Sequence, residues 1–419
     1  MPYREQIPVD KGLDNTISFL LEGYLYISNR TKRYHRNMFA TRLLGGKQVV
    51  CMLGEEAAKV FYDEERFKRQ GAAPKRLLQT LFGEDGVQTL DNDTHRLRKG
   101  LFMSLMTAER LQDIAAIVKA QWNVSLKKWG NMNKIELYDE AKEIMTWSAC
   151  SWAGVPLTDS VLNDMTAWLS SMFEAGGVVG PRHWRGKVGR NQAEQWVERL
   201  ITDVRNGQLE VAEGKALSKI ALYLDRNGDL LEPKIAAVEL INILRPIVAI
   251  SVYVAFCALA LYEHPQAKEQ LVNGTDDDYR MFVQEVRRYY PFFPTAIAKA
   301  RKDFLWNGHD FRKGTLVLLD LYGTNHDANH WKRPHEFKPE RFKNRKGTPF
   351  DFIPQGGGDY YKNHRCPGEW LTINVMQACL DMLVNQMDYH VPKQNLRFSM
   401  TRFPSLPKSR FIMMEVRAK

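Results

Sequence analysis

The sequence predicts a mainly α-helical fold with a minor β-sheet region, organised as a single large domain over residues 1–419. Three observations carry this prediction. Apolar residues recur at three- and four-residue spacing from about Ala57 to Tyr290, which indicates amphipathic helices. Short strand-like segments lie before and after that region. No internal repeat, low-complexity segment or obvious linker divides the chain.

The elements follow in chain order. The segment "MFATRLLGGKQVVCML" predicts two strands joined at Gly45-Gly46, because paired glycines are typical of tight hairpin turns. Helical periodicity is clear in "GLFMSLMTAERLQDIAAIVKAQWNV" and in "AEQWVERLITDVRNG". Between these two, glycine, proline and basic residues predict a loop from Gly176 to Arg190. After Pro291, "TLVLLDLYG", "LRFSM" and "RFIMMEV" predict short strands.

Composition narrows the class of protein. Hydrophobic residues make up 44% and charged residues 26%, as in soluble globular proteins. The net charge of +10 favours acidic ligands, but the basic residues are too dispersed to indicate nucleic acid. The N-terminus lacks the apolar core of a signal peptide. The uncharged run from Ile247 to Tyr262 has sixteen residues, and roughly 20 are needed to span a bilayer. We therefore expect a cytoplasmic protein with no membrane span.

The five cysteines do not form a disulfide pattern, because their number is odd and no C-x-x-C is present. Four of them have apolar neighbours that are typical of core residues. The exception is Cys366 in "FIPQGGGDYYKNHRCPGEW", which follows a glycine-rich loop and precedes a helical pattern. Backbone amides and the helix dipole at such a position stabilise a thiolate. A single thiolate there suits an axial haem ligand, and the alternative is a free cysteine at a helix start.

Further motifs give this cysteine a context. Glu285 and Arg288 in "EVRR" have the spacing of one helix face, and "FKPERF" follows about fifty residues later. The order E-x-x-R, P-E-R-F and a glycine-rich loop with C-x-G resembles the cytochrome P-450 family of haem-thiolate enzymes. The resemblance implies that family's fold and a haem b whose iron is bound by Cys366. It also implies a network that joins Glu285 and Arg288 to Arg341.

The same resemblance extends to the edge of the cofactor. It places the haem propionates near His95 in "DTHRLRKGLF", with Arg98 and Lys99 as nearby alternatives. The cysteine loop departs from the usual pattern, because Phe352 lies fourteen residues before Cys366. The loop is therefore lengthened, which indicates a specialised branch of the family.

The most apolar helix carries the second departure. The segment "AAVELINILRPIVAISVYVAFCALALYEHP" has Arg245 and Pro246 at its centre, where the family has an acidic residue and a threonine that relay protons. No carboxylate lies three or four residues from Arg245. Burial of a guanidinium without an anion lowers the stability of a protein by roughly several kcal/mol. Its counter-ion is either the substrate or, alternatively, solvent or a distant acid. Pro246 kinks or opens the helix, which makes room for a headgroup or is only a structural kink.

The Arg-Pro pair and the lengthened loop resemble the fatty-acid peroxygenase branch of the family. This resemblance implies long-chain fatty acids and hydrogen peroxide as partners, with no redox partner required. The carboxylate held by Arg245 replaces the missing proton relay as general acid–base. Members with glutamine at the position of Gln88 favour hydroxylation at the α and β carbons, whereas histidine favours decarboxylation to terminal alkenes. We expect hydroxylation with partial decarboxylation; the alternative for Gln88 is an ordinary polar loop residue.

The remaining candidates concern the substrate chain and competing functions. By resemblance in position, four apolar residues line the channel, although each has ordinary core packing as its alternative: Leu81, Phe82, Phe173 and Phe292. One competing function is a conventional monooxygenase, whose acidic ferredoxin would suit the basic chain but whose acid–threonine pair is missing. Another is a non-catalytic haem- or lipid-binding protein, and a third is a protein that binds no haem.

Overall fold

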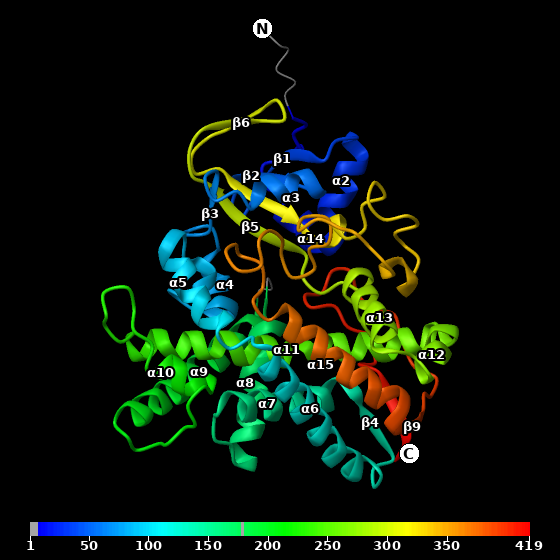
Figure 1. The fold of residues 1–419 in the computed structure, drawn as a ribbon. Helices are drawn as coiled ribbons and strands as arrows, with labels where there is room; N and C mark the ends of the chain where they lie inside the picture. The colour runs from blue at the N-terminus through cyan, green and yellow to red at the C-terminus, as the bar shows by residue number, and fades with distance from the viewer. Residues whose placement is uncertain (1–6, 177–179) are drawn as a thin grey trace.

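The computed structural model describes residues 7–176 and 180–419. Figure 1 shows a large helical part and, above it, a smaller part built around a β-sheet. The longer helices are α5 (Asn92–Met103), α6 (Ala108–Trp129), α7 (Leu137–Ala153), α8 (Asp159–Glu174), α9 (Pro181–Arg205), α11 (Pro233–Glu263), α13 (Asp276–Tyr289) and α15 (Glu369–Asp381). The shorter ones are α1 (Thr16–Glu22), α2 (Tyr26–Tyr34), α3 (Glu55–Phe61), α4 (Lys75–Leu77), α10 (Ala216–Ala221), α12 (Pro265–Val272) and α14 (Leu321–Thr324). The predicted fold class, mainly helical with a minor sheet, is confirmed.

Helix α11 forms the centre of the helical core. It is apolar around nearly its whole circumference, which is the pattern of a helix that is covered on all sides. It packs against α7, α8, α9 and α15 (Figure 1). Among the described helices, α11 alone is long and apolar enough to cross a bilayer by length and composition, but 94% of its apolar window is buried inside the protein.

The main sheet has the strand order β1-β2-β8-β5-β3. Its strands are β1 (Met38–Leu43), β2 (Lys47–Met52), β3 (Phe67–Lys68), β5 (Thr295–Ala300) and β8 (Leu316–Asp320). Strands β1 and β2 are antiparallel, so the predicted hairpin at Gly45-Gly46 is confirmed. Alternate residues of β2 and β8 enter two separate apolar clusters, which means that the sheet is covered on both faces.

Smaller strands complete the fold. They are β4 (Lys134–Glu136), β9 (Met387–His390) and β10 (Ile412–Ala418) in one sheet, and β6 (Phe304–Trp306) and β7 (His309–Phe311) in another. The predicted strands in "TLVLLDLYG" and "RFIMMEV" correspond to β8 and β10 and are confirmed. The predicted strand in "LRFSM" is wrong, because that segment forms only an isolated bridge between Phe398 and Pro407.

The predicted loop from Gly176 to Arg190 is also wrong over most of its length. Residues 177–179 lie outside the described residues, but α9 begins at Pro181, where a proline is compatible with a first helical turn. The glycines that indicated a loop are contact points with α8. A Cβ at Gly186 would overlap the Ala175 Cβ, and one at Gly189 would overlap the Ser171 Oγ. Only glycine allows the two helices to approach this closely.

Candidate active site

Cys366 lies on a loop that the preceding glycines shape. Gly356 and Gly358 have φ values of 93° and 87°, a left-handed conformation that favours glycine. The loop returns so that the Cys366 amide donates to the Gln355 carbonyl at 3.0 Å, and the Gln355 Nε2 lies 3.7 Å from the sulfur. Helix α15 begins three residues later at Glu369, as the sequence predicts.

The thiol does not ionise readily by itself. Burial raises the pKa of Cys366, and a hydrogen bond from the Gly368 amide and the charges of Lys99 and Arg287 oppose this only in part. The Gly368 amide thus stabilises a thiolate, as the sequence predicts for a backbone amide, but burial outweighs this contribution. A metal ion bound to the sulfur would reverse the balance, because coordination deprotonates a thiol. The Gly368 amide and the Gln355 Nε2 at the sulfur are compatible with a thiolate that binds a metal ion.

Arg245 of α11 is a buried cation without a described counter-ion. Its side chain is 5% exposed, and its Nη1 donates to the carbonyl oxygen of Leu81 in the short π-helical segment η2 (Leu78–Phe82). Within residues 7–176 and 180–419, no carboxylate pairs with it. The pKa of Arg245 is lowered to about 9, chiefly by burial and also by the charge of Arg190, while Cys366 opposes both. A buried guanidinium in this state would gain most from an anionic ligand.

Gln88 is linked to the same helix through a chain of hydrogen bonds. It lies in the short helix η3 (Val87–Thr89), and its Oε1 accepts from the Asn242 Nδ2 at 3.1 Å. The same nitrogen lies 3.3 Å from Glu239, which pairs with Arg98 at 2.6 Å. Burial raises the pKa of Glu239, and Arg98 opposes the rise. Arg98, a candidate for the haem propionates, therefore has a buried partner on α11 already.

Pro246 lies inside α11, which continues through it as one helix. Since proline has no N–H, the carbonyl four residues earlier, that of Asn242, receives no donor from this position. The opening in the hydrogen-bond ladder thus falls about one turn before Arg245, at Asn242, whose side chain donates to Gln88. The structure therefore places Gln88, Arg245 and Pro246 around one section of α11.

A group of buried basic side chains lies beside the cysteine loop. His95 is 2% exposed and stacks on His364 with 3.8 Å between ring centroids. Lys99 donates to the carbonyls of Asn363 and Arg365. Burial lowers the pKa of His95 to about 4 and that of Lys99 to about 8. These buried basic groups have too little negative charge around them to offset their burial, so the carboxylates of a haem fit this set of N–H donors.

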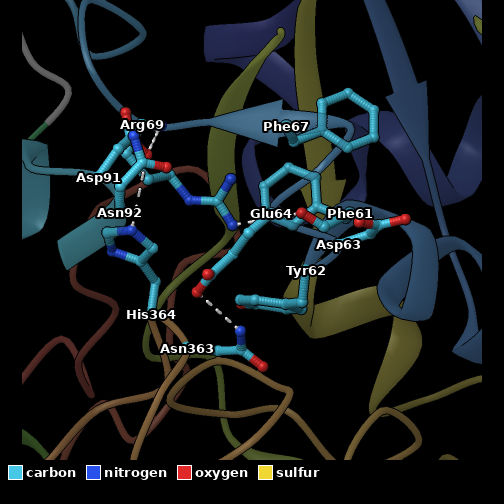
Figure 2. Close-up of a pocket in the computed structure, with 10 residues that line it drawn as sticks. All are labelled: Phe61, Tyr62, Asp63, Glu64, Phe67, Arg69, Asp91, Asn92, Asn363 and His364. Carbon is cyan, nitrogen blue, oxygen red and sulfur yellow. Dashed lines mark hydrogen bonds and ion pairs between the residues drawn. The ribbon is translucent and has the colours of Figure 1, made fainter. Parts of the chain in front are cut away.

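Arg69 is a further candidate for this group that the sequence did not indicate. It follows β3, is 8% exposed, and lies with Asp91 and His364 in the small pocket of Figure 2. Asp91 accepts from the Arg69 amide at 2.9 Å and lies 4.0 Å from the His364 Nε2. Burial also lowers the pKa of Arg69. Arg69 reaches the cluster only through the fold, since it lies far from His95 and Cys366 in sequence.

The apolar candidates occupy different parts of the core. Leu81 and Phe173 are buried, in η2 and near the end of α8, whereas Phe82 and Phe292 are partly buried against the main core. Leu81 adjoins Arg245 through its carbonyl. Phe292 reaches α11 by stacking on Tyr253 at 4.3 Å. Of the four, Leu81 is thus the one joined directly to the arginine by a described hydrogen bond.

Behind the cysteine loop, the structure brings Glu285, Arg288 and Arg341 together. Both oxygens of Glu285 accept from Arg288, at 2.7 and 2.8 Å, and both side chains are fully buried. Arg341, in the short helix η4 (Pro339–Phe342), donates to Glu285 at 3.1 Å. A second chain runs from Arg287 to Glu369 at 2.7 Å. These contacts fix α13 against the segments that surround Cys366.

Comparisons with known proteins agree with this arrangement. Residues 279–414 match the family model for cytochrome P450. The structure resembles that of cytochrome P450EX alpha with myristic acid, with a TM-score of 0.96 and 46% identity over 99% of this chain and 100% of that one. It also resembles a variant of cytochrome P450 OleT in complex with arachidonic acid, with a TM-score of 0.95 and 36% identity over 99% of each chain. A mutant of cytochrome P450SP alpha gives a TM-score of 0.95 and 45% identity over 97% of this chain and 100% of that one.

Matches to curated relatives are more partial. Cytochrome P450 71A8 of Mentha piperita is 28% identical over 151 residues, which is 33% of this chain and 29% of the relative. Psoralen synthase of Pastinaca sativa is 31% identical over 28% of this chain and 25% of its own length. The chain thus spans less than a third of the length of these two relatives.

Proposed function

Because the chain belongs to the cytochrome P450 family, within the group of fatty-acid peroxygenases, and is a haem-thiolate oxidoreductase, we propose that it uses hydrogen peroxide to hydroxylate long-chain fatty acids. Hydroxylation occurs at the α and β carbons, with partial decarboxylation to terminal alkenes. The observation that carries the proposal is Arg245, a buried guanidinium that no described carboxylate neutralises. Two of the similar structures contain fatty acids, namely myristic and arachidonic acid.

In this proposal the residues around Cys366 hold the cofactor. Cys366 would bind the iron, Lys99 and Arg69 would supply positive charge for the haem carboxylates, and His95, whose lowered pKa leaves the ring neutral, would donate an N–H. When bound, the haem supplies the oxidising chemistry, and its thiolate ligand favours cleavage of the peroxide O–O bond. The hydrogen bonds of Glu285 with Arg288 and Arg341 hold α13 and η4 together behind the cysteine loop.

Arg245 binds the fatty-acid carboxylate through a charge-assisted, bidentate contact. An arginine and a proline occupy the place of the family's acid and alcohol, so these two side chains provide no proton relay. A carboxylate oxygen of the substrate accepts and returns the proton instead, as a general acid–base. The carbons next to that carboxylate are held closest to the oxidant, which selects the α and β positions.

Gln88 determines the ratio of hydroxylation to decarboxylation by positioning the substrate or a water molecule, and it does not donate an acidic proton. Its amide has no acidic proton to give, and Asn242 holds its oxygen. We therefore propose that hydroxylation exceeds decarboxylation. The apolar side chains near η2 and α8 receive the hydrocarbon chain, which gains free energy in proportion to the apolar surface removed from water. The residues proposed to line this channel are Leu81, Phe82, Phe173 and Phe292.

Peroxide-driven turnover tests this function. The haem-loaded protein is given a series of saturated fatty acids with hydrogen peroxide alone, or with NADPH and a reductase–ferredoxin pair, and the products are identified by mass spectrometry. Peroxide alone should yield 2- and 3-hydroxy acids with a minor alkene fraction. If products form only with NADPH and the reductase, the protein is a conventional monooxygenase. A haem spectral shift on substrate binding without any product would indicate a binding protein.

A further inference from the structure

A second arginine, Arg190, lies beside Arg245 and has no part in the function proposed above. It belongs to the portion of α9 that the sequence predicted to be loop, and it is 2% exposed. Its Nε pairs with Glu194 at 2.6 Å. Its Nη1 donates to the carbonyl oxygens of Leu81 at 3.1 Å and Thr80 at 3.4 Å. Arg190 thus joins α9 to the η2 segment through two backbone carbonyls.

The two arginines share an acceptor. The Leu81 carbonyl oxygen receives a hydrogen bond from Arg245 and another from Arg190. The Nη2 of Arg190 is buried and has no partner within the described residues. A Cβ at Gly83 would overlap this nitrogen, so the glycine makes the approach possible. The guanidiniums also interact electrostatically, because the charge of Arg190 helps to lower the pKa of Arg245.

This shared contact matters when an anion binds. A carboxylate that pairs with Arg245 competes with the Leu81 carbonyl, the one hydrogen-bond acceptor of Arg245 among the described residues, for the N–H groups of the guanidinium. A buried carbonyl that loses its donor loses stability unless another donor remains. Arg190 remains, because Glu194 and the Thr80 carbonyl hold its side chain in place independently of Arg245. Arg190 therefore lowers the cost of moving the Arg245 hydrogen bond from the Leu81 carbonyl to a carboxylate.

We propose that Arg190 is a positioning residue for substrate binding: it keeps the Leu81 carbonyl hydrogen-bonded while Arg245 transfers to the fatty-acid carboxylate. This rests on the proposed role of Arg245. The effect is on binding, since Arg190 contacts the η2 backbone and not the reacting atoms.

The test is a binding titration of the haem-loaded protein, in which the shift of the haem spectrum reports binding. One titration uses myristic acid, and a second uses imidazole, a ligand that has no carboxylate. Arg190→Met should raise the Kd for myristic acid about tenfold, leave that for imidazole within about twofold, and raise KM far more than it lowers kcat. Arg190→Lys, which keeps a charge and a donor, should raise the fatty-acid Kd only about threefold. If Arg190→Met does not retain haem, Arg190→Lys carries the test.

Arg205→Met is the matched control. Arg205 is on the same helix and also donates to two backbone carbonyls, those of Ala221 and Leu231, each at 2.8 Å. Its variant should bind myristic acid like the wild type. An unchanged myristic acid Kd in both Arg190 variants would overturn the inference, as would equal weakening for imidazole or an equal effect of Arg205→Met. If the Arg190 effect is found but peroxide gives no product, the proposed function fails and the positioning role stands.

Discussion

Arg245 is the residue on which the proposed chemistry depends. Its side chain is 5% exposed, and the described chain gives it one carbonyl and a neighbouring cation, but no anion. Protein stability alone would favour an apolar residue at such a position. A ligand that brings its own carboxylate explains why an arginine is tolerated there. In the proposed function, binding and proton transfer then depend on the same substrate group.

Arg245→Ala should abolish peroxide-driven oxidation of fatty acids. Loss of a buried charge pair with the ligand is worth about 2–5 kcal/mol, which corresponds to a loss of at least about thirtyfold in kcat/KM. Product formation from myristic acid and peroxide measures this. A short carboxylic acid added as a decoy should not restore activity, because the variant cannot hold it. Wild-type rates in the variant would refute the anchoring role.

Gln88→His should raise the alkene fraction among the products. An imidazole can donate and accept a proton, whereas an amide only holds position. Asn242 can keep its hydrogen bond to either side chain, so the change acts on proton transfer more than on packing. The ratio of alkene to hydroxy acid, measured by gas chromatography, reports the effect. An unchanged ratio would show that Gln88 does not determine the outcome.

At the scale of elements, α13 contributes an ion pair that supports the cysteine side of the core. Glu285 neutralises Arg288 inside the protein and also accepts from Arg341 in η4. Removal of one member of a buried pair is costly because it leaves an uncompensated charge. The same helix has an exposed pair of the same i, i+3 spacing, Asp277 with Arg280. This offers a comparison in which burial is the main difference.

Glu285→Gln should lower the free energy of unfolding by about 3–5 kcal/mol. The matched change Asp277→Asn should lower it by under about 1 kcal/mol, because exposed pairs contribute little. Urea unfolding of both haem-loaded variants at one pH and salt concentration measures the two values. Similar losses in the two variants would contradict the importance assigned to burial.

The sequence predicted elements best where a local pattern determines them. Paired glycines indicated the β1–β2 hairpin, and apolar continuity indicated α11. The pattern failed at α9, where Gly186 and Gly189 serve close contact with α8 and do not break the helix. No local rule distinguishes these two uses of glycine. The misassigned segment is the one that contains Arg190, so its position could not be foreseen.

At the scale of the whole molecule, the site could be predicted only in part. Cys366, Arg245 and Glu285 were identified because motifs mark them in the chain. Arg69 and Arg190 have no such mark, and they reach the site through contacts between segments distant in sequence. The pairing of Arg98 with Glu239 likewise depends on how α5 and α11 pack. Contacts of this kind follow from the assembled fold.

His326 should make the stability of the whole chain depend on pH. Its pKa is lowered to about 3, chiefly by burial and also by the charges of Arg288, His335 and Arg341, while the hydrogen bond to the Tyr322 carbonyl opposes them. The unfolded chain, with a histidine pKa near 6.5, therefore binds one more proton between about pH 6.5 and 3. Stability should fall as pH falls through that window, by about 1.4 kcal/mol per pH unit from this group.

The variant His326→Asn isolates this contribution. Between pH 7 and pH 5, the wild type should lose about 2 kcal/mol more unfolding free energy than the variant. Urea unfolding at several pH values gives both curves. Parallel curves would show that His326 does not titrate as its surroundings indicate.

The central claim is that the substrate's carboxylate is both the counter-ion of Arg245 and the missing proton relay. The most direct measurement compares myristic acid with its methyl ester under hydrogen peroxide alone, using haem-loaded wild-type protein. The acid should give hydroxylated products, and the ester should give at least about a hundredfold less, because it can neither pair with Arg245 nor exchange a proton. Equal turnover of the acid and the ester would contradict the account.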